Sequence, residues 1–222
     1  MKLTIVAATG GIGRHLFDQA VAAGHEITAV VRNPARLGPG ASNVVATDLS
    51  ATDPVTLRSA VEGADAVLSG LGPRSRADAG VTARGTDALV KAMIAAGTTR
   101  IVVVSAAPIG TVPSPGRPHP PRHDPGDGFI MRHLLSPLVK TALRAHYADL
   151  ALMEDILRDS GLDWTAIRPP RLTDEPVSGS YRTAYDRNLR GGLRVSRADV
   201  AHLMLRVVDD PRTVGHAIGV AN

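Results

Sequence analysis

Short apolar segments alternate with longer segments of helical periodicity along most of the chain. The apolar runs have the length and β-branched content of buried strands, and they cover residues 2–8, 26–31, 43–46, 65–68, 100–105, 163–167 and 216–220. Helical spacing predicts a helix that ends at Gly24 and others over 55–61, 81–96 and 197–208, the last capped by Ser196. It also predicts one long helix, or two in tandem, over about 128–159. Strands that alternate with helices indicate an α/β fold, a doubly wound parallel sheet with helices on both faces.

One stretch interrupts this alternation. Seven prolines lie between Pro108 and Pro125, and such a segment forms neither a helix nor a central strand. We expect a loop over about 108–127, after a strand end where α/β folds keep substrate contacts; a surface insertion without a role is the alternative. Its His119, His123 and Asp124 have ligand-like side chains, but the surrounding prolines disfavour a preformed cage, and we expect no metal.

No internal repeat or linker divides the chain. We therefore expect a single domain over residues 1–222, with a small substrate-side region at about 169–196. Hydrophobic residues make up 44% and charged residues 21% of the sequence, values typical of a globular chain. The absence of cysteine excludes disulfides, thiolate metal sites and cysteine nucleophiles.

The charge and hydropathy patterns bear on partners. The net charge of +4 arises from scattered arginines that are matched by acids in most segments, which favours an anionic small-molecule partner and disfavours nucleic acid. No apolar run is long enough to span a membrane, and no signal-peptide core is present. We expect a cytoplasmic protein that is a monomer or a small homo-oligomer.

A glycine-rich turn lies between the first strand and the first helix, with the sequence Ala8-Thr9-Gly10-Gly11-Ile12-Gly13. Glycines let the backbone turn tightly and approach a pyrophosphate, and the following helix N-terminus offers free N–H groups and a positive dipole. This strand–turn–helix context indicates a Rossmann-type fold that binds a dinucleotide. An ordinary tight turn is the alternative.

The end of the second strand bears on which dinucleotide binds. NAD-preferring sites place an acid there for the ribose hydroxyls, whereas this chain has Arg32 and Arg36 with no acid between them. Charge-assisted hydrogen bonds from two guanidinium groups suit a 2′-phosphate. The segment therefore predicts NADP(H), and two solvated loop arginines are the alternative.

Together with this turn, several later segments resemble an atypical short-chain dehydrogenase/reductase. The most similar branch binds NAD(P)H and includes NmrA-like proteins and the biliverdin reductase B/flavin reductases; the resemblance covers nearly the whole chain, including Arg168-Pro169-Pro170 and Ser196-Arg197-Ala198-Asp199. The resemblance implies Gly10, Ile12 and Gly13 at the pyrophosphate, with Thr9 and Gly11 of the same turn also binding the cofactor. It implies Arg32 and Arg36 at the 2′-phosphate, Asp48 and Leu49 beside the adenine, and Leu71, Gly72, Pro73 and Arg74 beside the ribose and diphosphate. Around the nicotinamide it implies Ser105, Ala106, Pro169, Pro170 and Arg171.

The chain also departs from this family's pattern. Ala7 stands where the first glycine is common, a mild change, and Arg171 stands where the flavin-reductase relatives commonly have histidine. Well-known members use a Tyr-x-x-x-Lys pair, but here Ala151 occupies the position four residues after Tyr147 where that pair has its lysine. The missing pair disfavours an alcohol–ketone dehydrogenase, which needs a general acid/base at the carbonyl oxygen. It is compatible with hydride transfer to an acceptor that takes its proton from water.

Three side chains are candidates for a role in catalysis. Ser105, at the C-terminal end of a central strand, is positioned to bond the nicotinamide carboxamide or the substrate, or else only to satisfy the strand end. Tyr147 faces the pocket or packs in the core, and Arg171 pairs with an acidic substrate group. On the helix of Tyr147, we expect Met153 on the buried face and Glu154 on the exposed face.

We predict an NADPH-dependent reductase that transfers hydride to a conjugated acceptor such as a flavin, a tetrapyrrole-like molecule or a quinone. One alternative is a redox sensor of the NmrA-like type, which binds NADP(H) and a protein partner without turnover. Another is an epimerase, dehydratase or isomerase of the extended short-chain dehydrogenase branch. Those enzymes usually need the tyrosine–lysine pair and a larger C-terminal domain.

Overall fold

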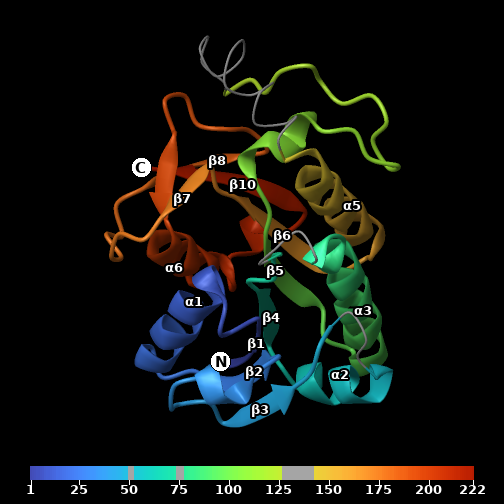
Figure 1. Ribbon diagram of the computed structural model, residues 1–222, viewed down its shortest axis with the longest axis vertical. Coiled ribbons are helices and arrows are strands. Elements are labelled where there is room, and N and C mark those ends of the chain that lie inside the picture. The colour runs from blue at the N-terminus through green and yellow to red at the C-terminus, as the bar shows by residue number, and fades with distance from the viewer. Residues whose placement is uncertain (50–52, 74–77, 127–142) are drawn as a thin grey trace.

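The computed structural model describes residues 1–49, 53–73, 78–126 and 143–222. At its centre is an eight-stranded sheet with the order β3-β2-β1-β4-β5-β6-β10-β8 (Figure 1). Neighbouring strands are parallel except for β8 and β10, which are antiparallel. The strands are β1 (Lys2–Val6), β2 (Glu26–Val31), β3 (Asn43–Ala46), β4 (Ala66–Ser69), β5 (Arg100–Val104), β6 (Asp163–Arg168), β8 (Arg182–Tyr185) and β10 (His216–Ala221).

Helices cover both faces of this sheet, which confirms the predicted doubly wound α/β fold (Figure 1). On one face, α1 and α6 pack against each other over a buried cluster that includes Ile5 and Phe17. On the other face, α2, α3 and α5 follow one another over a cluster that includes Leu89 and Met153. The helices are α1 (Gly11–Ala22), α2 (Pro54–Val61), α3 (Val81–Ala96), α5 (Arg144–Asp159) and α6 (Arg197–Val207).

Burial on both faces explains why the parallel strands were readable as apolar runs. All four residues of β4 are buried, as are four of the five residues of β1. A strand between two helical layers has no solvent-facing side, so hydrophobic residues occupy consecutive positions. Within the described ranges, no helix is both long and apolar enough to cross a membrane.

The region between β6 and α6 contains three short strands that the hydropathy pattern did not predict. β8 forms an edge of the main sheet, while β7 (Arg171–Thr173) and β9 (Arg194–Ser196) form a separate parallel pair. β7 and β8 have only exposed or half-buried residues. They therefore lack the continuous apolar run by which central strands are recognised.

The proline-rich segment is held against α5. It begins with a 3₁₀ turn over Ala107–Thr111. Asp155 of α5 accepts hydrogen bonds from the Ser114 hydroxyl at 2.9 Å and from the Gly116 amide at 2.8 Å. The helix expected over 128–159 is present as α5 from Arg144; residues 127–142 lie outside the described part of the chain.

Candidate functional site

A cavity of about 330 Å³ lies at the C-terminal edge of the sheet, between the ends of β1 and β4. There the chain turns from β1 to β2 on one side and later returns to β4 on the other, and α/β folds bind ligands at such a switch point. The predicted site residues that line the cavity are Gly10, Gly11, Ile12, Arg32, Asp48, Leu49, Leu71, Gly72, Pro73 and Ser105.

The glycine-rich turn leaves no room for a side chain at its last glycine. A Cβ at Gly13 would lie 2.1 Å from the carbonyl oxygen of Ala7. Ala7 itself has a φ of 58°, a left-handed conformation that costs a non-glycine residue about 1–2 kcal/mol. The departure at Ala7, expected to be mild, thus introduces backbone strain at the turn. The turn brings the unpaired N–H groups of the first turn of α1 to the cavity wall, where they suit a phosphate.

Arg32 lines the cavity after β2, and the structure brings to it an acid that the local sequence lacks. Its Nη1 lies 3.4 Å from Oδ1 of Asp78, which precedes α3 and also lines the cavity. Arg36 is exposed at the end of the short 3₁₀ turn Pro34–Arg36 and is not among the described lining residues. One of the two predicted arginines therefore lies at the cavity.

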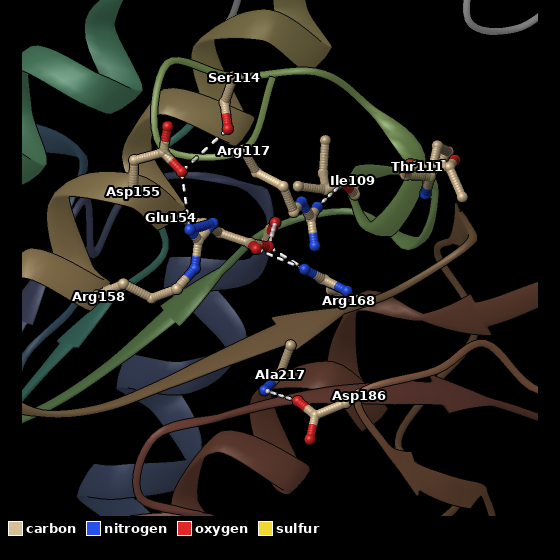
Figure 2. A network of polar contacts seen from close by, with 12 residues as sticks. Ile109, Thr111, Ser114, Arg117, Glu154, Asp155, Arg158, Arg168, Asp186 and Ala217 are labelled. Atoms are coloured by element: carbon tan, nitrogen blue, oxygen red, sulfur yellow. Dashed lines mark hydrogen bonds and ion pairs between the residues drawn. The ribbon is translucent and has the colours of Figure 1, made fainter. Parts of the chain in front are cut away.

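At another part of the cavity wall, Ser105 follows β5 and joins a buried ion pair. Its hydroxyl donates to Oε1 of Glu154 at 2.7 Å, and Arg168 donates to the same carboxylate through Nε at 2.9 Å and Nη2 at 2.5 Å. Figure 2 shows Glu154 of α5 and Arg168 of β6 directed toward each other. Glu154 is 1% exposed, so the expectation that it lies on the exposed helix face is wrong.

This network determines what Ser105 offers to a ligand. Because the hydroxyl hydrogen is directed at Glu154, the oxygen lone pairs remain, and Ser105 acts as an acceptor toward the cavity. Burial alone would lower the pKa of Arg168, but the hydrogen bond and ion pair with Glu154 raise that pKa above its ordinary value. The guanidinium thus keeps its positive charge beside Glu154.

A second cavity, of about 300 Å³, lies against the proline-rich loop and also includes Glu154 and Arg168 in its wall. Its other charged residues are Arg117, Arg158, Asp124 and Asp186, several of which Figure 2 shows. Three arginines thus face three acids, so the wall has no net charge that would select an anion. In the part of the chain that the structure describes, no group of three His, Asp or Glu residues is arranged to hold a metal ion.

Four polar residues that line the first cavity were not predicted: Thr47, Asp78, His146 and Arg197. His146 precedes Tyr147 in α5, and its Nδ1 is buried without a hydrogen-bond partner among the described residues. Burial lowers the pKa of His146 below its ordinary value, so the imidazole is neutral at pH 7. Arg197 begins α6 and lies over Gly11. A lone histidine and a lone arginine in helices carry no local signal that would have identified them.

The remaining predicted residues lie beside the cavity or away from it. Tyr147 is buried within the cluster between the sheet and α5, and burial raises its pKa. Arg171 is exposed at the start of β7, whereas its neighbour Leu172 lines the cavity. Ala106 and Pro169 lie beyond the adjacent ends of β5 and β6. The predicted residues outside the cavity wall are Thr9, Gly13, Arg36, Ala106, Tyr147, Pro169, Pro170 and Arg171; Arg74 lies outside the described residues.

A parallel sheet with a glycine-rich turn and a cavity at its switch point is the architecture of a dinucleotide-binding protein. Comparison with known families agrees: a family model described as NAD(P)H-binding matches residues 7–211. The chain belongs to this NAD(P)H-binding family.

Two curated relatives share part of the sequence. The chain is 28% identical over 225 residues to YhfK of Bacillus subtilis, named as an uncharacterized sugar epimerase, with 98% of this chain and 92% of YhfK covered. It is 27% identical over 168 residues to an uncharacterized protein of Mycobacterium tuberculosis. That match covers 76% of this chain but only 14% of the mycobacterial protein, so the chain spans a small part of that relative's length.

Solved structures share the fold over the full length of this chain. ChuY, an anaerobilin reductase from Escherichia coli, has a TM-score of 0.77 at 20% identity, with 97% of ChuY covered. A protein of Streptococcus pneumoniae assigned as an NADH-flavin reductase has a TM-score of 0.75 at 23% identity, with 99% of that protein covered. A short-chain dehydrogenase/reductase of Veillonella parvula in complex with NADP has a TM-score of 0.79 at 20% identity, with 94% of that protein covered.

Proposed function

We propose that the protein is an NADPH-dependent oxidoreductase that reduces a conjugated small-molecule acceptor, such as a flavin, a tetrapyrrole-like molecule or a quinone. The observation that carries this proposal is a single cavity whose wall includes the glycine-rich turn, Arg32 and Ser105. These groups fit the diphosphate, the 2′-phosphate and the carboxamide of NADPH. The flavin reductase and the anaerobilin reductase of the same fold support a reductase.

The preference for NADPH rests on Arg32. Its guanidinium reaches the cavity after β2, where this fold binds the adenosine ribose. A 2′-phosphate offers this arginine a doubly charged partner in place of the single carboxylate of Asp78, and bidentate guanidinium–phosphate bonds are stronger than a 3.4 Å contact with one carboxylate oxygen. Arg36, close by in sequence and exposed, adds positive charge to this end of the site.

The part of the cavity near Ser105 suits a flat conjugated ring. Val104, Leu150 and Leu172 contribute apolar walls beside Ser105 and His146. When bound, the nicotinamide supplies the hydride; the chain's own residues orient the two rings and exclude water. Ser105 accepts a hydrogen bond from the carboxamide or the acceptor. The buried Tyr147 has no lysine one helical turn on, so we assign the proton to water.

One observation favours a second candidate, an NAD(P)-dependent epimerase. YhfK, which matches 98% of this chain, is named as a sugar epimerase. An epimerase regenerates its cofactor within each turnover, so it consumes no NADPH. A reductase consumes one NADPH for each acceptor molecule, and this difference separates the two candidates.

The decisive experiment follows the absorbance of reduced nicotinamide when the purified protein is mixed with NADPH and a panel of flavins, quinones and linear tetrapyrroles. We expect steady, protein-dependent consumption of NADPH with at least one acceptor. Tight binding without consumption across the whole panel would replace the reductase with a cofactor-binding sensor. Conversion of a nucleotide sugar with catalytic cofactor would replace it with an epimerase.

We predict that Arg32→Ala weakens NADPH binding by about tenfold or more, because a charge-assisted hydrogen bond contributes about 1.5–3 kcal/mol. Binding of NADH, which lacks the 2′-phosphate, should change less than threefold. Isothermal titration calorimetry measures both dissociation constants. The matched control is Arg212→Ala, which removes an exposed arginine paired with Asp210. Equal losses for NADPH and NADH in Arg32→Ala would contradict the assignment of Arg32 to the 2′-phosphate.

A further inference from the structure

Arg197 lies across the turn that binds phosphate in this fold. A Cβ added at Gly11 would lie 3.0 Å from Nε and 3.1 Å from Cδ of Arg197, and both residues line the same cavity. We propose that Arg197 binds the diphosphate of the dinucleotide, together with the backbone amides at the start of α1. This inference rests on the proposed function, because it requires a dinucleotide in the cavity.

The backbone holds Arg197 in this position independently of any ligand. It is the first residue of α6, and the hydroxyl of the N-cap residue Ser196 accepts a hydrogen bond from the Asp199 amide at 2.9 Å. α6 packs along α1 on the same face of the sheet (Figure 1). Gln19 of α1 also donates to the Ala198 carbonyl oxygen at 2.9 Å. The start of α6 is thereby fixed against α1, and only the arginine side chain has to adjust to a phosphate.

The guanidinium retains donors for a ligand. Its Nη1 donates to Oδ1 of Asp174 at 2.5 Å, which leaves N–H groups on Nε and Nη2 within the described part of the chain. The Asp174 side chain is 86% exposed, and ion pairs with such exposed partners contribute little to stability. Asp174 therefore holds one side of the guanidinium, and the other side is available over the glycine-rich turn.

The charge distribution makes this part of the cavity suitable for an anion. The N-terminus of α1 presents N–H groups and a positive dipole to the turn, and Arg197 adds a full positive charge whose planar fork matches two phosphate oxygens. Asp78, one of the acids in the cavity wall, pairs with Arg32. The two arginines thus have different partners: Arg32 distinguishes NADPH from NADH, and Arg197 binds a group that both dinucleotides carry.

This difference defines the experiment. Isothermal titration calorimetry is performed with NADPH, NADH and adenosine 2′-monophosphate, which has the 2′-phosphate but no diphosphate, on the wild type and Arg197→Ala. We expect Arg197→Ala to lower the affinities for NADPH and NADH by the same factor, about tenfold. The affinity for adenosine 2′-monophosphate should stay within about twofold of the wild-type value. Arg32→Ala should give the opposite pattern: the affinities for NADPH and adenosine 2′-monophosphate should fall, and the affinity for NADH should be retained.

Two further variants separate ligand binding from a structural role. Asp174→Asn removes the same ion pair but keeps the guanidinium, so we expect dinucleotide affinity within about twofold of the wild type. Arg194→Ala removes an arginine three positions earlier, which is paired with Glu175, and should leave all three affinities unchanged. Equal losses in Asp174→Asn and Arg197→Ala would mean that the ion pair acts structurally, and would overturn the proposal.

The remaining outcomes are also distinct. Unchanged affinity of Arg197→Ala for both dinucleotides, or a loss confined to NADPH, would overturn the assignment of Arg197 to the diphosphate. Wild-type protein that binds the dinucleotides but consumes no NADPH would overturn the reductase and leave this inference standing. Wild-type protein that binds neither dinucleotide would overturn both.

Discussion

At the residue scale, the buried pair Glu154–Arg168 is the feature that sequence patterns concealed. Glu154 follows the buried Met153 in an amphipathic helix, a position at which a glutamate normally marks the solvent-facing side. It is buried because Arg168, 14 residues later at the end of β6, provides a counter-charge, and Ser105 provides a further hydrogen bond. A buried carboxylate is tolerated when it is paired in this way.

We predict that Glu154→Gln lowers the free energy of unfolding by about 3 kcal/mol, because it leaves the Arg168 guanidinium buried without a counter-charge. Urea denaturation followed by circular dichroism measures this loss. The double variant Glu154→Gln/Arg168→Met removes both charges and should recover at least 1 kcal/mol of it. A single variant as stable as the wild type would show that the pair contributes no net stability.

At the scale of an element, α6 is a helix whose unpaired backbone groups find hydrogen-bond partners by different means at its two ends. Its N-terminus is capped locally by Ser196, as the sequence predicts. Its C-terminus is satisfied by Arg100 of β5, which donates to the carbonyl oxygens of Val208 at 2.8 Å and Val207 at 2.7 Å. Burial lowers the pKa of Arg100, while nearby aspartates oppose this shift.

We predict that Arg100→Met destabilises the protein by about 3 kcal/mol or more, because it removes several buried hydrogen bonds from a charged donor, each of which contributes about 1.5–3 kcal/mol. Arg100 also donates to the Thr165 and Thr213 hydroxyls, at 2.9 and 3.1 Å. Thermal and urea unfolding measure the effect. Arg212→Ala, an exposed arginine, is the matched control and should change stability by less than about 0.5 kcal/mol. Comparable small effects for both variants would contradict this role of Arg100.

At the scale of the whole molecule, buried aspartates connect loops to distant helices. Asp149 accepts the amides of Thr82 and Ala83, each at 3.0 Å, and so joins α5 to the start of α3. Asp155 holds the proline-rich loop, and Asp199 of α6 accepts the amides of Ser178 and Gly179 at 2.8 and 2.9 Å. These carboxylates hold the loops around the site in place.

Low pH should weaken these connections, and a variant of Asp199 can test this. Burial alone would raise the pKa of Asp199, but hydrogen bonds from the Gly179 and Ser178 amides and from the Ser178 and Ser196 hydroxyls lower it. Its stabilisation is therefore complete above the unfolded pKa of about 3.9 and is lost as the pH falls through the lower folded value. We predict that the stability difference between the wild type and Asp199→Asn, measured by urea unfolding, is largest at pH 7 and shrinks below about pH 4. A difference that stays constant with pH would contradict this.

The sequence by itself determined the order of the central strands and the helices and the location of the glycine-rich turn. Central strands, helix stops and the turn at Gly10–Gly13 each depend on consecutive residues, and the physical constraints on them are local: burial on two faces, a glycine where no Cβ fits, a cap at Ser196. The short strands β7 and β8 were missed because they bury little, and β9 was missed because a strand of three residues is too short to show such a pattern.

Only the tertiary structure decided which side chains share the site. It brought Asp78 to Arg32, Glu154 to Arg168 and Arg197 to Gly11, and it buried Tyr147 while the preceding His146 reached the cavity. These contacts join segments far apart along the chain, and their strength depends on distance and burial. Neither quantity is encoded in the spacing of residues along the sequence, because both arise only when the sheet and its two helical layers come together.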